Sequence, residues 1–262
     1  MDYAKICREV ENAAQKAAQY IKSERQKFDT SKIEVKGKND FVSYVDKTSE
    51  KLLVEELSKI VPEAGFITEE GTKKEVKTLN WIIDPLDGTT NFIHGLCPHC
   101  VSIALQNNGK TVVGVVFEIG LQECFSAYLG GGAFLNGKSI KVSDKQTLKD
   151  SLVGTGFPYS DYSKLDGFMK SMEFMMRNTH GMRRLGSAAT DLVYVACGRL
   201  DTFYEYGLSP WDVAAGAFIV EEAGGKVSDF SGKGNYIFGK EIIAANGLVF
   251  NEFLENIKSF MN

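Results

Sequence analysis

Acidic residues stand at the ends of short apolar segments in this sequence. Asp84-Pro85-Leu86-Asp87 directly follows the apolar residues Trp81-Ile82-Ile83. Proline has no backbone N–H, so we expect Pro85 to lead the chain out of the strand. Asp87 can then converge with Asp84 on one point, and paired carboxylates are ligands that Mg²⁺ prefers. Turns without function are also rich in Asp and Gly, so for this segment alone both interpretations stay open.

Other acids at the ends of predicted elements favour the metal site. Glu69 follows the apolar residues Gly65-Phe66-Ile67, and Asp212 lies near the start of an apolar helix. Asp46 begins another predicted helix, where it is a plausible N-cap. Asp212 has a structural alternative too, because the helix dipole favours an acid in the first turn. After Asp87, the residues Gly88-Thr89-Thr90 can open a helix whose free N–H groups attract an anion.

The elements that must position these acids alternate between helices and strands. Apolar spacing predicts helices at 2–21, 46–60, 161–178, 187–198 and 210–223, and a last one ending near Phe260. Short apolar segments predict strands at 66–67, 81–83, 101–105, 112–117, 124–129, 152–155, 201–206 and 242–245. Gly130-Gly131-Gly132 and Asn136-Gly137 are predicted turns.

This order of elements predicts an α+β protein whose first half pairs its consecutive strands antiparallel. Residues 143–150 are the best candidate for a junction. We therefore expect an N-terminal half, 1–145, with most metal ligands, and a C-terminal half, 146–262, with Asp212 and the substrate contacts. The two halves would form one compact catalytic unit.

Composition limits the classes of partner. The chain has 262 residues, of which 44% are apolar and 24% charged, as in soluble proteins with a substantial core. A net charge of −4 argues against a nucleic-acid partner held on a basic face. The sequence has no apolar run long enough to span a bilayer and no apolar signal-peptide core. We therefore predict a cytoplasmic protein without a membrane partner.

The cysteines predict neither a disulfide framework nor a zinc site. There are five of them, scattered along the chain. Cys97-Pro98-His99-Cys100 has the C-x-x-C form of redox and zinc motifs, but no second pair completes a zinc site. We expect both thiols to pack at the start of the strand at 101–105.

Four segments together resemble the motif set of the inositol monophosphatase family: GFITEEG (65–71), WIIDPLDGTTNF (81–92), RLGSAATDLVYVACGRLDTFYE (184–205) and SPWDVAAGAFIVEEAGG (209–225). The matches run from about residue 2 to residue 260. The resemblance implies a layered αβαβα sandwich, usually a homodimer, that hydrolyses phosphate monoesters with Mg²⁺ and is often inhibited by lithium. An inositol monophosphate, a small phosphorylated polyol, is the expected substrate.

Two alternatives to that activity stay open. Related enzymes hydrolyse fructose bisphosphate, histidinol phosphate or nucleotide 3′-phosphates with the same metal motifs. A non-catalytic regulatory role in RNA metabolism is the alternative from another class.

The resemblance also implies roles for the acids at the metal site. Glu69, Asp84 and the carbonyl of Leu86 would bind a first Mg²⁺, and Asp84, Asp87 and Asp212 a second. Glu69 would support a third ion through water, which gives two to three ions per site. Thr89, paired with Asp46, would orient the attacking water.

The substrate side follows from the same resemblance. The backbone N–H groups of Gly88 and Thr89 would hold the phosphate. The remaining implied substrate contacts are Gly186, Ser187, Ala188, Glu205 and Asp212. The segment Lys36 to Asp40 matches the mobile metal-responsive loop of the family. Arg183 and Arg184 could reach phosphate or a partner subunit, but such a pair is more often solvated.

Overall fold

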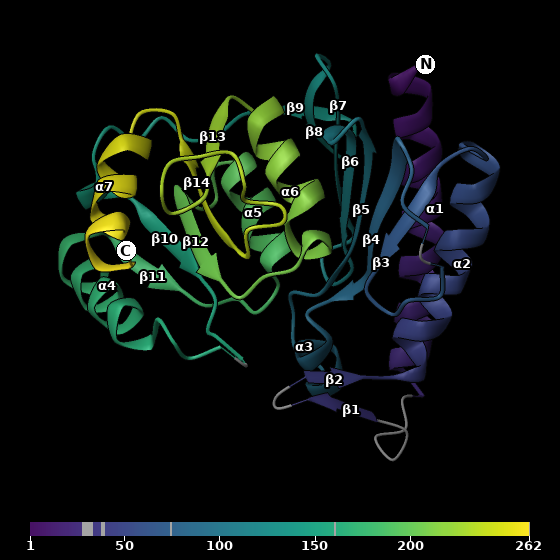
Figure 1. Cartoon of the computed structure of the whole chain (residues 1–262), viewed down its shortest axis with the longest axis horizontal. Coiled ribbons are helices and arrows are strands. Elements are labelled where there is room, and N and C mark those ends of the chain that lie inside the picture. The colour runs from purple at the N-terminus through teal and green to yellow at the C-terminus, as the bar shows by residue number, and fades with distance from the viewer. Residues whose placement is uncertain (28–33, 38–39, 74, 160, 262) are drawn as a thin grey trace.

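The computed structural model describes residues 1–27, 34–37, 40–73, 75–159 and 161–261 of the chain. Its elements form five alternating layers of helix and sheet (Figure 1). From the N-terminal side these are α1 and α2, a seven-stranded sheet, α5 and α6, a five-stranded sheet, and α4 and α7. The layered α+β sandwich expected from the sequence is confirmed.

The seven-stranded sheet contains β3 to β9 in chain order. Only β3 and β4 run parallel, so the predicted antiparallel pairing is confirmed for the other neighbours. The sequence patterns missed two short strands next to the predicted turns, β8 and β9. The strands are β3 (Gly65–Thr68), β4 (Leu79–Asp87), β5 (Cys100–Asn107), β6 (Lys110–Glu118), β7 (Glu123–Tyr128), β8 (Gly132–Leu135) and β9 (Lys138–Ile140).

The five-stranded sheet has the order β11-β10-β12-β14-β13. Strand β10 is parallel to both neighbours, whereas β14 is antiparallel to both of its own. Strands β11 and β13 were not predicted, because each is short and contains glycine and a basic residue. The strands are β10 (Leu152–Thr155), β11 (Gly181–Arg183), β12 (Thr202–Tyr206), β13 (Gly225–Ser228) and β14 (Glu241–Asn246). A short 3-10 helix, η2 (Leu148–Asp150), lies in the predicted junction.

The middle layer is covered on both sides. Helix α6 (Pro210–Glu222) is buried from Val213 to Val220 without a polar face, as expected for a helix between two sheets. Glycines allow the close approach. A Cβ atom at Gly114 of β6 would lie 3.0 Å from the carbonyl oxygen of Ala215. One at Gly216 would lie 2.7 Å from Leu192 of α5 (Ala188–Ala196).

The outer helices begin at capping residues. Asp2 caps α1 (Tyr3–Arg25), because its Oδ1 accepts from the N–H of Lys5 at 2.9 Å. The prediction that Asp46 caps the second helix was wrong. Ser43 is the N-cap of α2 (Tyr44–Ile60), and Asp46 is the third helical residue, whose Oδ2 accepts from the Ser43 N–H at 2.8 Å. The capping box gives Asp46 a fixed position inside the protein.

Three further segments complete the chain. Helices α4 (Leu165–Asn178) and α7 (Phe250–Met261) cover the far side of the five-stranded sheet, and α4 begins later than predicted. The prediction of a loop at 36–40 was wrong for Lys36 and Gly37, which belong to β1 (Glu34–Gly37), and for Asp40, which begins the paired strand β2 (Asp40–Val42). Lys38 and Asn39 of that loop lie outside the described residues. In the part of the chain that the structure describes, no helix is long and apolar enough to cross a membrane.

Candidate active site

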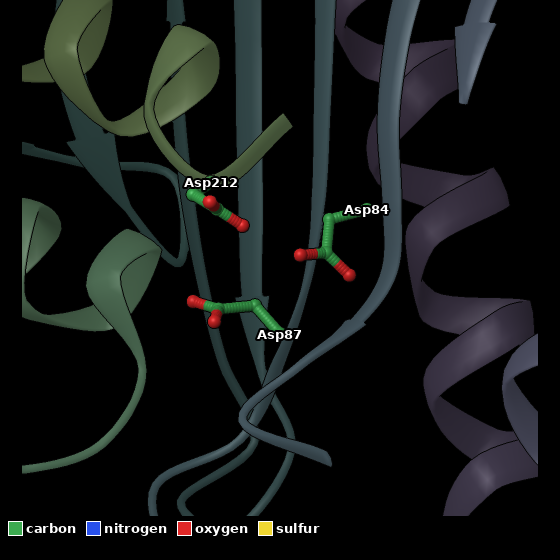
Figure 2. Close-up of side chains that lie close together, drawn as sticks. All are labelled: Asp84, Asp87 and Asp212. Atoms are coloured by element: carbon green, nitrogen blue, oxygen red, sulfur yellow. The ribbon is translucent and has the colours of Figure 1, made fainter. Parts of the chain in front are cut away.

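Three aspartates meet between the seven-stranded sheet and the middle helices. One carboxylate oxygen from each of Asp84, Asp87 and Asp212 lies within 4.8 Å of those of the other two. Figure 2 shows Asp84 and Asp87 on β4 and Asp212 in the first turn of α6, gathered around one point. Asp84 is buried, and the other two are half-buried.

A bulge in β4 explains why Asp84 and Asp87 converge. Asp84 pairs with Ser102 and Asp87 with Cys100, so three steps along β4 match two along β5. Side chains three residues apart in a regular strand point to opposite faces, and one extra residue returns the second to the same face. The prediction that Pro85 ends the strand was therefore wrong. Its missing N–H is tolerated because it lies in the bulge.

Backbone groups from three segments hold these carboxylates. Asp84 Oδ1 accepts from the N–H of Leu86 at 2.9 Å. Asp87 Oδ2 accepts from the N–H of Ala189 at 2.8 Å, and Asp212 Oδ2 accepts from the N–H of Ser209 at 2.6 Å. The arrangement of the three carboxylates is thus set by the fold rather than by side-chain freedom.

The electrostatics of this cluster favour a cation. Burial, followed by the charges of Glu69, Asp87 and Asp212, raises the pKa of Asp84 well above its usual range. Burial also raises the pKa of Asp87, against the opposing hydrogen bonds from Ser187 and Ala189. A divalent cation would relieve this repulsion. The all-oxygen set of donors fits Mg²⁺ or a similar hard cation.

Thr89 and Asp46, expected to act as a pair, are in contact. Gly88 adopts a left-handed conformation (φ 88°) between β4 and the short helix α3 (Thr89–His94). Thr89 Oγ1 lies 2.9 Å from Asp46 Oδ1 and 2.9 Å from the carbonyl oxygen of Leu86. Burial raises the pKa of Asp46, although hydrogen bonds from Ser43 and Thr89 oppose this shift. Leu86, expected to offer its carbonyl to a metal, thus also contacts the Thr89 hydroxyl.

Glu69 lies at the edge of the aspartate cluster. It follows β3, and its N–H donates to the carbonyl of Ile83 at 3.3 Å. Its charge is the strongest acidic influence on the pKa of Asp84, after burial. Its carboxylate is not one of the three that lie within 4.8 Å of one another.

The sequence patterns missed Glu50, which holds the turn after Glu69. Glu50 lies on α2 and is fully buried. It accepts hydrogen bonds from the Thr68 hydroxyl at 3.0 Å and from the N–H groups of Glu70 and Thr72 at 2.7 Å each. A glutamate on an amphipathic helix resembles a solvated one, so only the tertiary contacts identify its role.

The predicted substrate residues border the same site. A Cβ atom at Gly88 would lie 3.2 Å from the Gly186 carbonyl oxygen, which places these two backbone segments against each other. Ala188 is the first residue of α5. The carboxylate of Glu205 is buried on β12 directly against Gly156, where a Cβ atom would lie 1.9 Å from its Oε1. Burial, then the nearby charges of Asp212 and Asp87, raises the Glu205 pKa well above its usual range.

Ser187 contacts the aspartate cluster directly. Its hydroxyl lies 2.7 Å from Asp87 Oδ2, and it caps α5. Asp191, one turn further along α5, was not singled out from the sequence. It is buried, and its Oδ1 has no hydrogen-bond partner among the described residues.

Arg184 is not the solvated residue that the sequence favoured. Its guanidinium lies over the rings of Phe157 and Tyr159, 5.2 Å and 5.7 Å from their centroids. It also donates to the Tyr159 hydroxyl. Arg183 is exposed and donates to the carbonyl of Met182 at 2.8 Å.

The two cysteines of the C-x-x-C segment have different environments. Cys100 is buried as the first residue of β5, as expected, and its Sγ lies 3.8 Å from Asp87 Oδ2. The packing interpretation was wrong for Cys97, which is exposed. All five cysteines are free thiols.

Comparison with known proteins supports the fold and identifies the family. Residues 2–259 match the model of the inositol monophosphatase family. An inositol-1-monophosphatase of Mesorhizobium japonicum is 39% identical, with 94% of this chain and 93% of the relative covered. The Nus factor SuhB of Pseudomonas aeruginosa is 42% identical, with the same shares covered. The solved structure of an inositol monophosphatase (IMPase) from Thermotoga maritima is 37% identical, covers 95% of each chain and superimposes with a TM-score of 0.87.

These relatives bear on two of the predictions. The name Nus factor gives no support to the expectation that nucleic acid is not a partner. The family match supports a phosphorylated small-molecule substrate and a metal-dependent phosphatase. On its sequence match, its fold and its cluster of aspartates, the chain belongs to the inositol monophosphatase family.

Proposed function

We propose that this chain is a Mg²⁺-dependent phosphatase that hydrolyses the phosphate monoester of a small polyol, with inositol monophosphate as the foremost candidate. The observation that carries the proposal is the convergence of Asp84, Asp87 and Asp212 within 4.8 Å. The hydrogen-bonded pair of Thr89 and Asp46 lies directly after β4. A structural acidic cluster would not need this second, polar pair.

The acids would hold the ions. Asp84, Asp87 and Asp212, with Glu69 and the Leu86 carbonyl, are the proposed ligands for two to three Mg²⁺. Bound there, the ions would activate a water molecule, stabilise the leaving oxygen and attract the phosphate that clustered carboxylates alone repel.

Thr89 and the start of α3 have the remaining tasks. With the Thr89 proton directed to Asp46, the Thr89 oxygen can accept a hydrogen bond from the attacking water and so orient it. The N–H groups of Gly88 and Thr89 stand where a short helix begins, and they can donate to phosphate oxygens. No covalent phosphoenzyme is needed for this route.

Glu205 supports a hydroxyl-bearing leaving group. The oxygens of a carboxyl group accept hydrogen bonds, so Glu205 can pair with donors such as the hydroxyls of a polyol. Its burial against Gly156 makes an unsatisfied Glu205 costly, which favours substrates that bring a donor.

The decisive experiment is a phosphate-release screen over phosphorylated metabolites with Mg²⁺ and with excess EDTA. The panel includes inositol, fructose, histidinol and nucleotide phosphates. We expect release that needs Mg²⁺ and is greatest with an inositol phosphate. Asp84→Asn should abolish release and leave the fold intact. Asp229→Asn is a matched control, because Asp229 is also buried and accepts from the N–H groups of Ser231 and Lys233 in the turn after β13. Full release in EDTA would refute the metal mechanism.

Relatives named Nus factor SuhB favour a second candidate, a regulatory role in RNA metabolism. If the chain has this regulatory role, wild type and Asp84→Asn should bind equally well to transcription or ribosomal components in a pull-down. Mg²⁺-dependent phosphate release without such binding would exclude the regulatory role. We further propose a homodimer and inhibition by lithium, which sedimentation and the same release assay test.

A further inference from the structure

Three groups from β5 and from the start of α5 contact one oxygen of the candidate metal ligand Asp87. Asp87 Oδ2 lies 2.7 Å from Ser187 Oγ, 2.8 Å from the N–H of Ala189 and 3.8 Å from Cys100 Sγ. As a metal ligand Asp87 would be ionised and would only accept, so Ser187 and Ala189 donate to it, whereas the Cys100 thiol also lies 3.5 Å from Ser187 Oγ. The carboxylate is thereby fixed by groups that are as much as 102 residues away in the chain.

The hydrogen bonds of Ser187 connect one further residue, Thr190, to Asp87. The single proton of the Ser187 hydroxyl is assigned to Asp87 rather than to Thr190 Oγ1, because an ionised carboxylate is the stronger acceptor. Ser187 Oγ also lies 2.7 Å from Thr190 Oγ1, which is fully buried. With that assignment Thr190 can donate to Ser187, and the donors then run from Thr190 through Ser187 to Asp87.

We propose that Thr190 and Ser187 are positioning residues that set the metal affinity of Asp87. This inference rests on the proposed function, because it takes Asp87 as a metal ligand. Groups that bond to metal-binding carboxylates fix their orientation, and their loss typically weakens metal binding about 10–100-fold. A donor chain also polarises each of its members, so the outer hydroxyl of Thr190 strengthens the inner bond.

The competing explanation is that Ser187 is only a helix cap. Its Oγ accepts from the N–H of Thr190 at 3.3 Å, and it is the N-cap of α5. Loss of a cap lowers stability but has no specific effect on metal binding. The Thr190 hydroxyl separates the two explanations, because it takes no part in the cap. Thr190→Val removes this hydroxyl at nearly constant shape, whereas Thr190→Ser keeps it.

Calorimetric titration of Mg²⁺ into the metal-free full-length protein tests the proposal, with thermal unfolding measured in parallel. Ser187→Ala should raise the Mg²⁺ dissociation constant at least about tenfold. Thr190→Val should raise it about threefold, as expected for a weakened rather than a lost hydrogen bond. Thr190→Ser should bind like wild type. So should Ser171→Ala, which removes a buried hydroxyl that contacts the Phe168 carbonyl at 2.7 Å and Tyr204 Oη at 2.9 Å in another part of the core.

The outcomes separate this inference from the proposed function. Unchanged Mg²⁺ binding in Thr190→Val, with only a lower Tm in Ser187→Ala, would overturn the positioning role and leave the phosphatase untouched. If wild type bound Mg²⁺ no better than Asp84→Asn does, the proposed function and this inference would both fall. Should Ser187→Ala fail to fold, the comparison of Thr190→Val with Thr190→Ser decides alone.

Discussion

Glu50 offers a test of whether the turn after β3 must be held for the metal site to work. Glu50 Oε1 accepts from the Thr68 hydroxyl and the Thr72 N–H, and Oε2 accepts from the Glu70 N–H. Glu50→Gln keeps the size of the side chain but replaces one acceptor by an NH₂ group. That group must then face a donor of the turn that carries Glu69.

The expected loss of stability in Glu50→Gln follows from counting these hydrogen bonds. The least costly orientation places the NH₂ group against the Glu70 N–H and loses one hydrogen bond to a charged acceptor, worth about 1.5–3 kcal/mol. At about 2–4 °C per kcal/mol for a chain of this size class, Tm should fall by about 3–12 °C. Displacement of Glu69 should also raise the Mg²⁺ concentration for half-maximal activity about tenfold.

The assay combines thermal unfolding with phosphate release at increasing Mg²⁺. Glu222→Gln is the matched control, because Glu222 accepts from the N–H groups of Gly130 and Gly132, at 3.0 Å each, in the turn before β8. It should lower Tm and leave the Mg²⁺ requirement unchanged. A normal Mg²⁺ requirement in Glu50→Gln, despite the expected fall in Tm, would show that Glu50 serves stability alone.

Three other substitutions test separate steps. Thr89→Ala should lower kcat by at least about 10² with little change in KM, because the task proposed for Thr89 is to orient the attacking water. A kcat within about threefold of wild type would contradict this role. Glu205→Gln should lower kcat/KM for inositol phosphate at least about tenfold but spare p-nitrophenyl phosphate, whereas equal losses would assign Glu205 to the metal site or the fold. Burial, followed by the charges of Glu205 and Asp87, raises the pKa of Asp191, so the folded state binds this proton more tightly than the unfolded state. The free energy of unfolding should then decrease as pH rises above about 4. Measured from pH 5 to 8, it should decrease less steeply in Asp191→Asn than in wild type. An equal slope in the two proteins would refute the raised pKa.

Local patterns in the sequence predicted the elements that carry strong periodicity or long apolar runs. The buried strands β5 and β6 and the helices α1 and α6 were found for that reason. Strands β8, β9, β11 and β13 have three or four residues each, too few for an alternating pattern to stand out. Their pairing is decided by neighbouring strands, which a local window does not contain.

The candidate site also contains some residues that local sequence patterns indicated and others that they missed. Asp84 and Asp87 were singled out because they lie three residues apart after an apolar segment, but the bulge that turns them to one face was not foreseen. Glu50 was missed because its partners lie 18 to 22 residues away, across the turn after β3. The bond between Ser187 and Asp87 joins residues 100 positions apart. Residue types thus indicate candidate ligands, whereas the groups that orient them depend on tertiary contacts.

The middle helices explain how carboxylates from distant segments of the chain keep one spacing. Asp212 is fixed in the first turn of α6, and Asp87 is held by the first turn of α5. The two helices meet where Gly216 leaves room for Leu192. Because α6 also packs closely against Gly114 of the seven-stranded sheet, a shift of either helix would change the distance between the carboxylates. Packed interiors resist such shifts, so the buried apolar layer sets the geometry of the charged site.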